Sequence, residues 1–309
     1  MISIVVPCYN EQESAPLFYE KATEVLKTMN TEYEIIFVDD GSKDKTLPVL
    51  KILASKDKKV KYLSFSRNFG KESAILAGLR AAKGELTAVM DADLQDPPDL
   101  LPDMRDAIEN EGYDTIATRR VTRKGEPVIR SFFARQFYKI INRSSDVEVI
   151  DGARDFRMMN RAVVDAILEL KEYNRFSKGI YGWIGFKTKW LTYENIERVA
   201  GTTKWSFGKL FYYAIDGIVG FSTAPLRLAA FAGIIVSFIA FCFLLFVIIR
   251  AIVFGDDTKG WASTVSIILF SSGLQFLFIG ILGEYLGKTY METKKRPLYF
   301  VRETNIDEI

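Results

Sequence analysis

The sequence predicts an α/β domain built on a parallel sheet, followed by two membrane-spanning helices. Three observations lead to this fold class. Short apolar segments alternate with segments of helical periodicity over residues 2–90. Polar residues follow these apolar segments, and in a parallel sheet the carboxyl ends of the strands lie at one edge. Two long uncharged runs then occur after residue 226. With 309 residues, 49% of them hydrophobic, the chain is long enough to bury a sizeable core.

The amino-terminal part alternates predicted strands and helices. Strands are expected at Ile2–Val6, Ile35–Val38, Val60–Leu63 and Leu86–Met90, and helices around Leu17–Met29, Leu47–Leu53 and Ala74–Ala82. Strand–helix repetition is typical of a parallel sheet, because parallel neighbours need a crossover connection. The first strand is preceded by no basic leader, so we expect no signal peptide.

The residue inventory restricts the chemistry. The 41 Lys and Arg residues nearly balance the 39 Asp and Glu residues, and a net charge of +2 argues against a nucleic-acid partner. Histidine is absent, which excludes Ser-His-Asp triads and imidazole-ligated metals. Cys8 and Cys242 lie in apolar segments, so neither a disulfide framework nor a zinc site is expected. Carboxylates must therefore perform any metal or acid–base work.

Two apolar runs predict membrane spans. Leu228–Ile249 and Trp261–Leu282 each contain 22 residues without a formal charge. A helix of that length covers roughly 33 Å, close to the hydrocarbon thickness of about 30 Å. We therefore expect spans at about 228–250 and 261–283, within a membrane segment 226–287, rather than two buried core helices.

The segments that flank these runs predict their orientation. The tail, residues 288–309, carries five basic residues, whereas the connection between the runs has two basic and two acidic ones. The positive-inside rule places the tail in the cytoplasm, and two spans then place the domain of residues 1–205 there too. In the juxtamembrane segment 206–225, apolar residues mixed with Lys209 and Asp216 predict an amphipathic helix at the membrane surface.

Asp91 and Asp93 flank one small residue directly after the strand Leu86–Met90. This spacing lets both carboxylates face one hard divalent cation, Mg²⁺ or Mn²⁺, with Gln95 as a further oxygen ligand. A lone Asp-X-Asp also occurs in ordinary turns, but the position at a strand end favours a metal site. Such a metal would stabilise a nucleoside diphosphate as it leaves.

A second polar segment, Asp39-Asp40-Gly41-Ser42, follows another predicted strand. A carboxylate such as Asp39 can accept the N–H of a uracil ring, with Asp40 as a second contact. The same composition also fits a turn with a helix cap, and both interpretations can hold at once. Arg67 and Lys71, which flank Asn68-Phe69-Gly70 before a helix, are candidates for phosphate binding, with a solvated loop as the alternative.

Three segments resemble family 2 glycosyltransferases, and in particular the polyprenyl-phosphate branch with dolichyl-phosphate mannose synthase and the two-span bactoprenol glucosyltransferases. They are Val5-Val6-Pro7-Cys8-Tyr9-Asn10-Glu11, Val38-Asp39-Asp40-Gly41-Ser42 and Asp91-Ala92-Asp93-Leu94-Gln95-Asp96-Pro97-Pro98. The resemblance covers essentially the whole chain and implies a GT-A (Rossmann-like) fold. It implies nucleoside-pocket roles for Pro7, Tyr9, Glu11 and Asp39, and metal-binding roles for Asp91, Asp93 and Gln95.

A basic stretch is the candidate acceptor site. It either receives a lipid phosphate near the membrane or forms a solvated basic face, and its members are Arg119, Arg120, Arg123, Lys124, Arg130 and Arg135. In the synthases that the chain resembles, an arginine after the fifth strand and another in the following helix bind the lipid phosphate. Arg119 and Arg130 occupy those positions, whereas Ala134 stands where the family often has a serine.

Asp155-Phe156-Arg157 resembles a Gly-Asp-Phe-Arg segment of the branch, with Arg154 in place of the glycine. The resemblance makes Asp155, together with Asp93, the catalytic pair. Asp155 is either a base or a positioning group, because a phosphate monoester with a second pKa of about 6 is already mostly dianionic at neutral pH. A structural ion pair is the alternative. The resemblance also places Arg157, Thr203 and Lys204 at the lipid phosphate, and Arg175 and Lys178 at the donor diphosphate.

The resemblance implies the reaction as well. A monosaccharide from a nucleotide sugar, UDP-glucose or UDP-N-acetylhexosamine, is transferred with inversion to a polyprenyl phosphate, which is undecaprenyl phosphate in a bacterium. It further implies a homo-oligomer, a tetramer in related enzymes. A processive polysaccharide synthase is an alternative that two spans and the lack of a Gln-X-X-Arg-Trp motif disfavour. A catalytically silent nucleotide-sugar-binding scaffold is another, which the set Asp91, Asp93 and Gln95 argues against.

Overall fold

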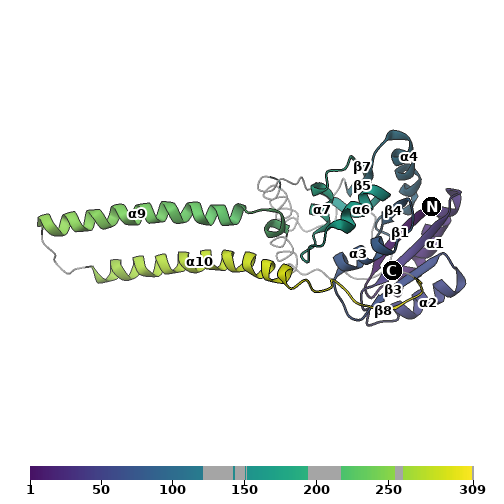
Figure 1. Cartoon of the computed structure of the whole chain (residues 1–309), viewed down its shortest axis with the longest axis horizontal. Coiled ribbons are helices and arrows are strands. Elements are labelled where there is room, and N and C mark those ends of the chain that lie inside the picture. Colours follow the sequence, from purple (N-terminus) through teal and green to yellow (C-terminus); the bar gives the residue numbers. More distant parts are fainter. Residues whose placement is uncertain (121–141, 143–149, 151, 194–216, 255–259, 308–309) are drawn as a thin grey trace.

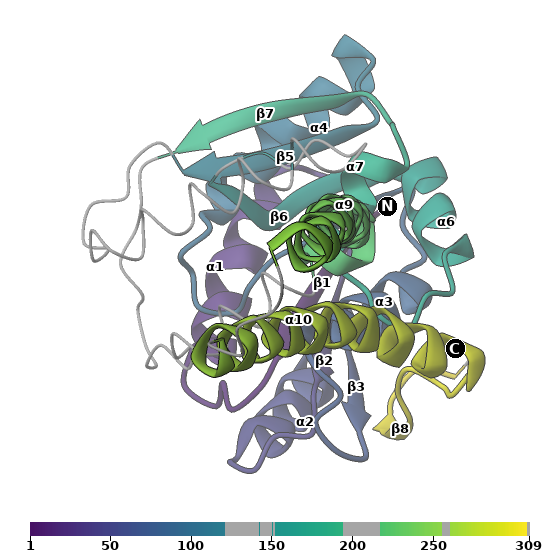
Figure 2. The same cartoon turned by 90° about the vertical axis from the view of Figure 1, so that its left-hand side faces the viewer.

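The computed structural model describes residues 1–120, 142, 150, 152–193, 217–254 and 260–307. They form a helix-covered sheet domain and two long helices that extend away from it (Figure 1). The sheet has eight strands in the order β7-β5-β6-β4-β1-β2-β3-β8. Seen along the long helices, the sheet crosses the domain behind them, with β7 at one edge and β8 near the other (Figure 2).

The centre of the sheet is parallel, as the alternating pattern predicted. Its strands are β1 (Ile2–Cys8), β2 (Tyr33–Asp39), β3 (Val60–Phe65) and β4 (Leu86–Val89). The helices that follow them are α1 (Ser14–Thr28), α2 (Thr46–Lys56), α3 (Lys71–Ala81), η1 (Pro98–Leu100) and α4 (Leu101–Glu111). The strands are nearly continuous apolar runs because both faces of the sheet are covered.

Alternate residues of β1 contribute to two cores. Ile4 and Val6 pack with Phe18 of α1 in one cluster, which also includes residues of α2 and α4. Val5 points to the opposite face and packs in a second cluster with residues of α3, α6 (Arg161–Glu169) and α7 (Ser177–Trp183). This period of two is the geometry of a strand with both faces buried.

Close packing of α3 on β1 requires glycine at position 78. A Cβ atom at Gly78 would lie 2.2 Å from Cγ1 of Val5. We expect Gly78→Ala to lower the free energy of unfolding by about 1–3 kcal/mol, because α3 must move off the sheet. Chemical denaturation measures this loss. The matched control is Gly233→Ala, where the nearest atom to the added Cβ, on Phe278, is 3.9 Å away. Equal stability of both variants would contradict the packing argument.

The outer strands make the sheet mixed, which the strand–helix pattern did not predict. β6 (Ala153–Asn160) inserts between β4 and β5 (Thr115–Arg120) and is antiparallel to both. β7 (Thr188–Tyr193) continues the sheet in parallel with β5. The regular alternation of strand and helix ends at β4, so pairing beyond that point depends on contacts between distant segments rather than on local periodicity.

The segment after the second long helix is part of the sheet domain, which corrects the expectation of a separate tail over residues 288–309. Its strand β8 (Val301–Thr304) pairs antiparallel with β3. Just before β8, the Tyr299 ring stacks on Phe65 at 4.9 Å between centroids, and the N–H of Ser66 donates to the Phe300 carbonyl at 3.0 Å. The chain therefore leaves the domain through one long helix and returns through the other.

The long helices are α9 (Ala224–Phe254) and α10 (Trp261–Thr293). Both are long and apolar enough to cross a membrane, over Ala224–Phe243 and Ile267–Thr293. Both helices extend beyond the spans expected from the uncharged runs. Most of the predicted amphipathic segment lies outside the described residues, but its final part, residues 217–221, is helical. Phe221 there packs against Gly179 of α7, where an added Cβ would lie 2.5 Å from the ring.

Candidate active site

Polar side chains converge where β1, β2 and β4 end. These strands are adjacent and parallel, so their carboxyl ends meet at one edge of the sheet. Two residues just beyond these ends, Asn10 and Leu94, have φ of 55° although neither is glycine. Such left-handed backbone is unfavourable for a side chain like that of leucine, and it is concentrated at functional sites. The Leu94 conformation bends the chain directly after Asp93.

The turn after β4 presents the predicted metal ligands. Asp93 is 7% exposed, and its Oδ1 accepts a hydrogen bond from the N–H of Gln95 at 3.1 Å. Asp91, Asp93 and Gln95 supply oxygen ligands from one short turn, and that chemistry fits Mg²⁺ or Mn²⁺. Among the described residues, no group of three His, Cys, Asp or Glu side chains is placed to hold a metal. A cation here would therefore take further ligands from substrate phosphates and water, as Mg²⁺ commonly does.

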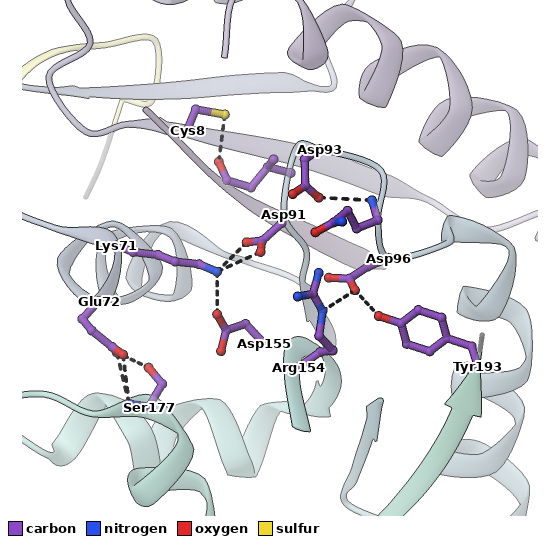
Figure 3. A network of polar contacts seen from close by, with 12 residues as sticks. Cys8, Lys71, Glu72, Asp91, Asp93, Asp96, Arg154, Asp155, Ser177 and Tyr193 are labelled. Atoms are coloured by element: carbon purple, nitrogen blue, oxygen red, sulfur yellow. Dashed lines mark hydrogen bonds and ion pairs between the residues drawn. The ribbon is translucent and has the colours of Figure 1, made fainter. Parts of the chain in front are cut away.

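Lys71 joins β6 to residues 91–95, which are called the metal turn below because they carry the predicted metal ligands. Its Nζ lies 2.6 Å from Oδ1 of Asp91 and 2.5 Å from Oδ2 of Asp155. Figure 3 shows Lys71 between these two carboxylates. Burial alone would raise the pKa of the Asp155 carboxyl, but the charges of Lys71 and Lys178 and the hydrogen bond from Lys71 hold it well below its usual range. Asp155 is thus an ionised carboxylate beside two cations, and its structural ion pair is with Lys71 rather than with Arg157.

Asp40 shapes the loop that leads to Lys71. Its two carboxylate oxygens accept the N–H groups of Phe69 at 2.6 Å and Gly70 at 2.9 Å. The backbone also approaches closely, since a Cβ at Gly41, whose φ is 64°, would lie 2.3 Å from the carbonyl carbon of Arg67. Burial raises the pKa of Asp40 to about 6. These contacts give Asp40 a structural role, and the predicted second nucleoside contact stays a prediction.

The other predicted nucleoside residues lie at the same edge of the sheet. Asp39 ends β2 and accepts hydrogen bonds from the Ser42 N–H at 3.0 Å and the Ser64 hydroxyl at 2.7 Å. The turn interpretation of this segment is therefore realised, and a carboxylate retains further lone pairs for a ligand. Glu11 accepts a hydrogen bond from the Ser14 hydroxyl. Pro7 lies near the end of β1, and Tyr9 directly follows that strand. The guanidinium carbon of Arg67 lies 4.3 Å from the centroid of the Phe69 ring.

A buried network that the sequence did not reveal holds the metal turn. Asp96 is 0% exposed, and its Oδ1 accepts hydrogen bonds from Nε of Arg154 at 2.9 Å and from the Tyr193 hydroxyl (Figure 3). The network ties the segment after β4 to β6 and β7. These partners lie 58 and 97 positions from Asp96 in the sequence. The only sequence signal was Arg154 itself, which stands in place of the family glycine.

Two arginines predicted to bind phosphate have contacts within the protein. Arg157 is 3% exposed, and its guanidinium lies 3.3 Å from the centroid of the Tyr181 ring. Arg157 is therefore buried among the described residues, and its predicted contact with a lipid phosphate stays a prediction. Arg175 donates to the carbonyls of Leu170 at 2.6 Å and Ile167 at 3.4 Å. It satisfies carbonyls at the end of α6, which have no partner within the helix.

Lys178 lies in α7, whose start is held against α3. The carboxylate of Glu72 accepts hydrogen bonds from both the N–H and the hydroxyl of Ser177. Lys178 follows Ser177 in the sequence, and its charge acts on the Asp155 carboxyl together with that of Lys71. The sequence predicted both lysines as candidates but gave no sign that α3 and α7 are joined here.

The predicted acceptor residues are only partly described. Arg119 is exposed on β5 and stands opposite Ala153 of β6 in the sheet register. The residue opposite Arg119 on β6 therefore comes one position before Arg154 and two positions before Asp155. Arg130, Thr203 and Lys204 lie outside the described residues, so the structure does not bear on their predicted roles.

The chain has relatives of nearly its own length. Over 306 residues it is 45% identical to the protein CsbB of Bacillus subtilis (strain 168), with 99% of this chain and 92% of the relative covered. It is 42% identical over 301 residues to a prophage bactoprenol glucosyl transferase homolog of Escherichia coli (strain K12), covering 97% and 98%. An SfII prophage-derived bactoprenol glucosyl transferase of Shigella flexneri is 40% identical over 304 residues, covering 98% of both.

A solved structure of low sequence similarity accompanies these relatives. Glucosyl-3-phosphoglycerate synthase from Mycobacterium tuberculosis, in complex with Mn²⁺, uridine-diphosphate-glucose and phosphoglyceric acid, is 16% identical, with a TM-score of 0.47 over 71% of this chain and 77% of that chain. The model of glycosyl transferase family 2 matches residues 3–168. The mixed sheet of the domain is the GT-A-like α/β fold that the sequence predicted. The chain therefore belongs to glycosyl transferase family 2.

Proposed function

We propose that this glycosyltransferase moves one sugar from a nucleotide sugar to a polyprenyl phosphate at the membrane surface. The observation that carries the proposal is the combination of an acidic turn, Asp91-Ala92-Asp93, with a domain joined at both ends to two long apolar helices. The relatives named bactoprenol glucosyl transferases support the lipid acceptor. They also make UDP-glucose the first donor to test, ahead of UDP-N-acetylhexosamine.

The residues at the edge of the sheet have three proposed roles, which are metal binding, phosphate binding and nucleoside binding. Asp91, Asp93 and Gln95 would hold Mg²⁺ or Mn²⁺, and the bound cation would stabilise the charge of the departing diphosphate. Lys71 and Lys178 supply two further positive charges beside the phosphates of the donor. The nucleoside lies against the ends of β1 and β2, with its contacts at Pro7, Tyr9, Glu11 and Asp39, and Arg67 lies at the rim of this pocket.

The transfer is a single displacement. An oxygen of the lipid phosphate attacks the anomeric carbon as the bond from that carbon to the diphosphate oxygen breaks, so the configuration inverts. The electron pair leaves with the nucleoside diphosphate. The attacking phosphate is already largely dianionic, and Asp155 is held ionised beside Lys71. We therefore assign Asp155 to positioning of the substrates and of Lys71, rather than to proton abstraction.

The acceptor enters from the membrane side. Its phosphate is expected to meet Arg119 and Arg130, with Thr203 and Lys204 closer to the bilayer. The domain of residues 1–205 and the segment after α10 lie together on one side, because β8 pairs with β3. The basic residues after α10 favour the cytoplasmic side. A homo-oligomer, expected from the resemblance, is part of the same proposal.

A donor panel with metal depletion tests this function. Purified full-length chain in detergent is incubated with polyprenyl phosphate, Mg²⁺ or Mn²⁺ and one radiolabelled nucleotide sugar at a time. We expect label from UDP-glucose to enter the organic phase, and chelation by EDTA to abolish this until excess metal is restored. Transfer that persists in EDTA would contradict the metal assignment. Label from no donor would favour a nucleotide-sugar-binding scaffold.

A further inference from the structure

A cavity of about 240 Å³ lies where the chain returns from the second long helix to the domain. Three elements enclose it: α3, the end of α6 and the segment directly after α10. Its cationic lining residues are Arg80, Lys171 and Arg296, and its apolar walls come from Leu76, Leu170 and residues 297–299. The cavity is separate from the edge of the sheet that carries Asp91, Asp93 and Asp155.

The cavity carries positive charge only. No carboxylate lines it, and within the described part of the chain none of its three cations forms an ion pair. Lysines elsewhere on the domain do pair, as Lys189 does with Glu111. Arg80 is held in place by a neutral partner, because its guanidinium donates to the Tyr299 hydroxyl at 2.9 Å. Three cations around one hollow leave a positive potential that an anion would neutralise.

The cavity also lies next to the domain-side end of the second candidate span. The candidate span Ile267–Thr293 has 27 residues. At 1.5 Å per residue it covers about 40 Å, which equals the hydrocarbon core of about 30 Å and much of the headgroup layers. This candidate span ends at Thr293 on the domain side, and Arg296 follows it by three residues. Long basic side chains just beyond the end of a span reach lipid phosphates.

We propose that this cavity binds the phosphodiester headgroup of an anionic phospholipid, such as phosphatidylglycerol, from the leaflet that faces the domain. The guanidinium groups of Arg80 and Arg296 suit the oxygens of a phosphodiester, which they contact in a planar, two-pronged geometry, and Lys171 adds a point charge. The apolar walls cover the glycerol and the start of the acyl chains. This lipid is a bound component of the enzyme and is distinct from the acceptor, whose phosphate goes to the active site.

The location gives such a lipid a structural effect. Tyr299, which lines the cavity, stacks on Phe65 at the end of β3, and the loop that leads to Lys71 begins directly after that strand. The lipid headgroup thus contacts the segment that fastens the chain after α10 to the sheet. The inference requires that α9 and α10 span the membrane, but it does not depend on which sugar or acceptor the enzyme uses.

Native mass spectrometry of the full-length chain in neutral detergent tests the proposal. Phosphatidylglycerol and phosphatidylcholine are titrated separately, and we expect phosphatidylglycerol to bind at least about tenfold more tightly. Arg296→Ala and Lys171→Ala are each expected to weaken phosphatidylglycerol binding about fivefold and to leave phosphatidylcholine binding unchanged. The matched control is Lys295→Ala, which removes a neighbouring exposed cation that does not line the cavity.

The controls separate a built site from general surface charge. Equal weakening by Lys295→Ala would show that only the net charge of the segment matters, and would overturn the proposal. Equal binding of the two lipids would overturn it as well. Inorganic phosphate in large excess is expected to leave most of the bound phosphatidylglycerol in place, and complete displacement would identify a free-anion site instead. Unchanged thermal unfolding of each variant in detergent confirms that the variants are folded.

Discussion

Asp93→Ala is expected to reduce sugar transfer at least about a thousandfold while the protein stays folded. Metal stabilisation of a leaving group contributes several kcal/mol, and each tenfold in rate corresponds to about 1.4 kcal/mol. Asp93→Asn is the more conservative variant, because an amide oxygen can still accept the Gln95 N–H that Oδ1 of Asp93 accepts now. It should keep the shape of the turn and still lose most activity. Steady-state transfer with saturating metal measures both variants.

Asp99→Asn is the matched control for this prediction. Asp99 lies in η1, a few residues beyond the metal turn, and pairs with Lys21 at 3.2 Å on the surface. It carries the same charge near the same segment but faces away from the ligands, so its removal should change transfer less than about twofold. Full activity of Asp93→Asn, or equal losses from Asp93→Asn and Asp99→Asn, would exclude Asp93 as a metal ligand.

Arg154→Gly is expected to destabilise the domain by about 3–5 kcal/mol, because it leaves the carboxylate of Asp96 buried without its cation. Asp96 is 0% exposed, and its Oδ1 would keep the hydrogen bond from the Tyr193 hydroxyl but lose the one from Arg154. Glycine is also the residue that the resembling family carries here, so the substitution has no steric penalty of its own. Chemical denaturation followed by tryptophan fluorescence measures the loss. Lys189→Ala breaks an exposed pair with Glu111 and should lose less than about 1 kcal/mol.

A second variant distinguishes a buried ion pair from simple loss of packing. Arg154→Met combined with Asp96→Leu removes both charges and retains apolar volume. It is expected to be more stable than Arg154→Gly alone, because replacing a whole buried pair costs less than leaving one charge unpaired. Arg154→Met and Asp96→Leu are also measured singly. If the stability loss of the double variant equals the sum of these two losses, the pair is not coupled. The network would then be a set of separate contacts.

Features set by local pattern could be predicted from the sequence. The four central strands and the helices between them follow from periodicity within single segments. The acidic residues Asp91 and Asp93 follow β4, as the sequence predicted, and their role as metal ligands stays a prediction. The long helices follow from the length of the two uncharged apolar runs. Their actual ends extend further because polar residues such as Tyr290 and Glu292 continue the helix without adding to an apolar run.

Features set by distant contacts could not be predicted. Lys71 and Asp155 are 84 positions apart, and nothing in either segment indicates that β6 inserts beside β4. The return of the chain after α10 to pair with β3 joins residues more than 200 positions apart, as in the hydrogen bond from the Tyr62 N–H to the Asn305 side chain at 2.8 Å. The basic composition of this segment indicated only a basic tail on the cytoplasmic side.

Three predicted site residues have protein contacts that the sequence did not indicate, and their ligand roles stay predictions. Asp40, Arg157 and Arg175 each carry a group that suits a ligand, but the fold uses it for backbone N–H groups, an aromatic ring and helix carbonyls respectively. Charged side chains bind protein groups and ligands by the same interactions. Only the folded arrangement shows which of the two a given residue meets.

Mass and linkage analysis of the lipid product tests the central claim most directly. The full-length chain is incubated with polyprenyl phosphate, UDP-glucose and Mg²⁺, and the lipid fraction is examined by mass spectrometry and NMR. The account predicts polyprenyl phosphate carrying a single hexose, with the anomeric configuration opposite to that of the donor. Retained configuration would contradict the single displacement, lipid-linked or free sugar polymers would indicate a processive synthase, and absence of any sugar on the lipid would contradict the proposed acceptor.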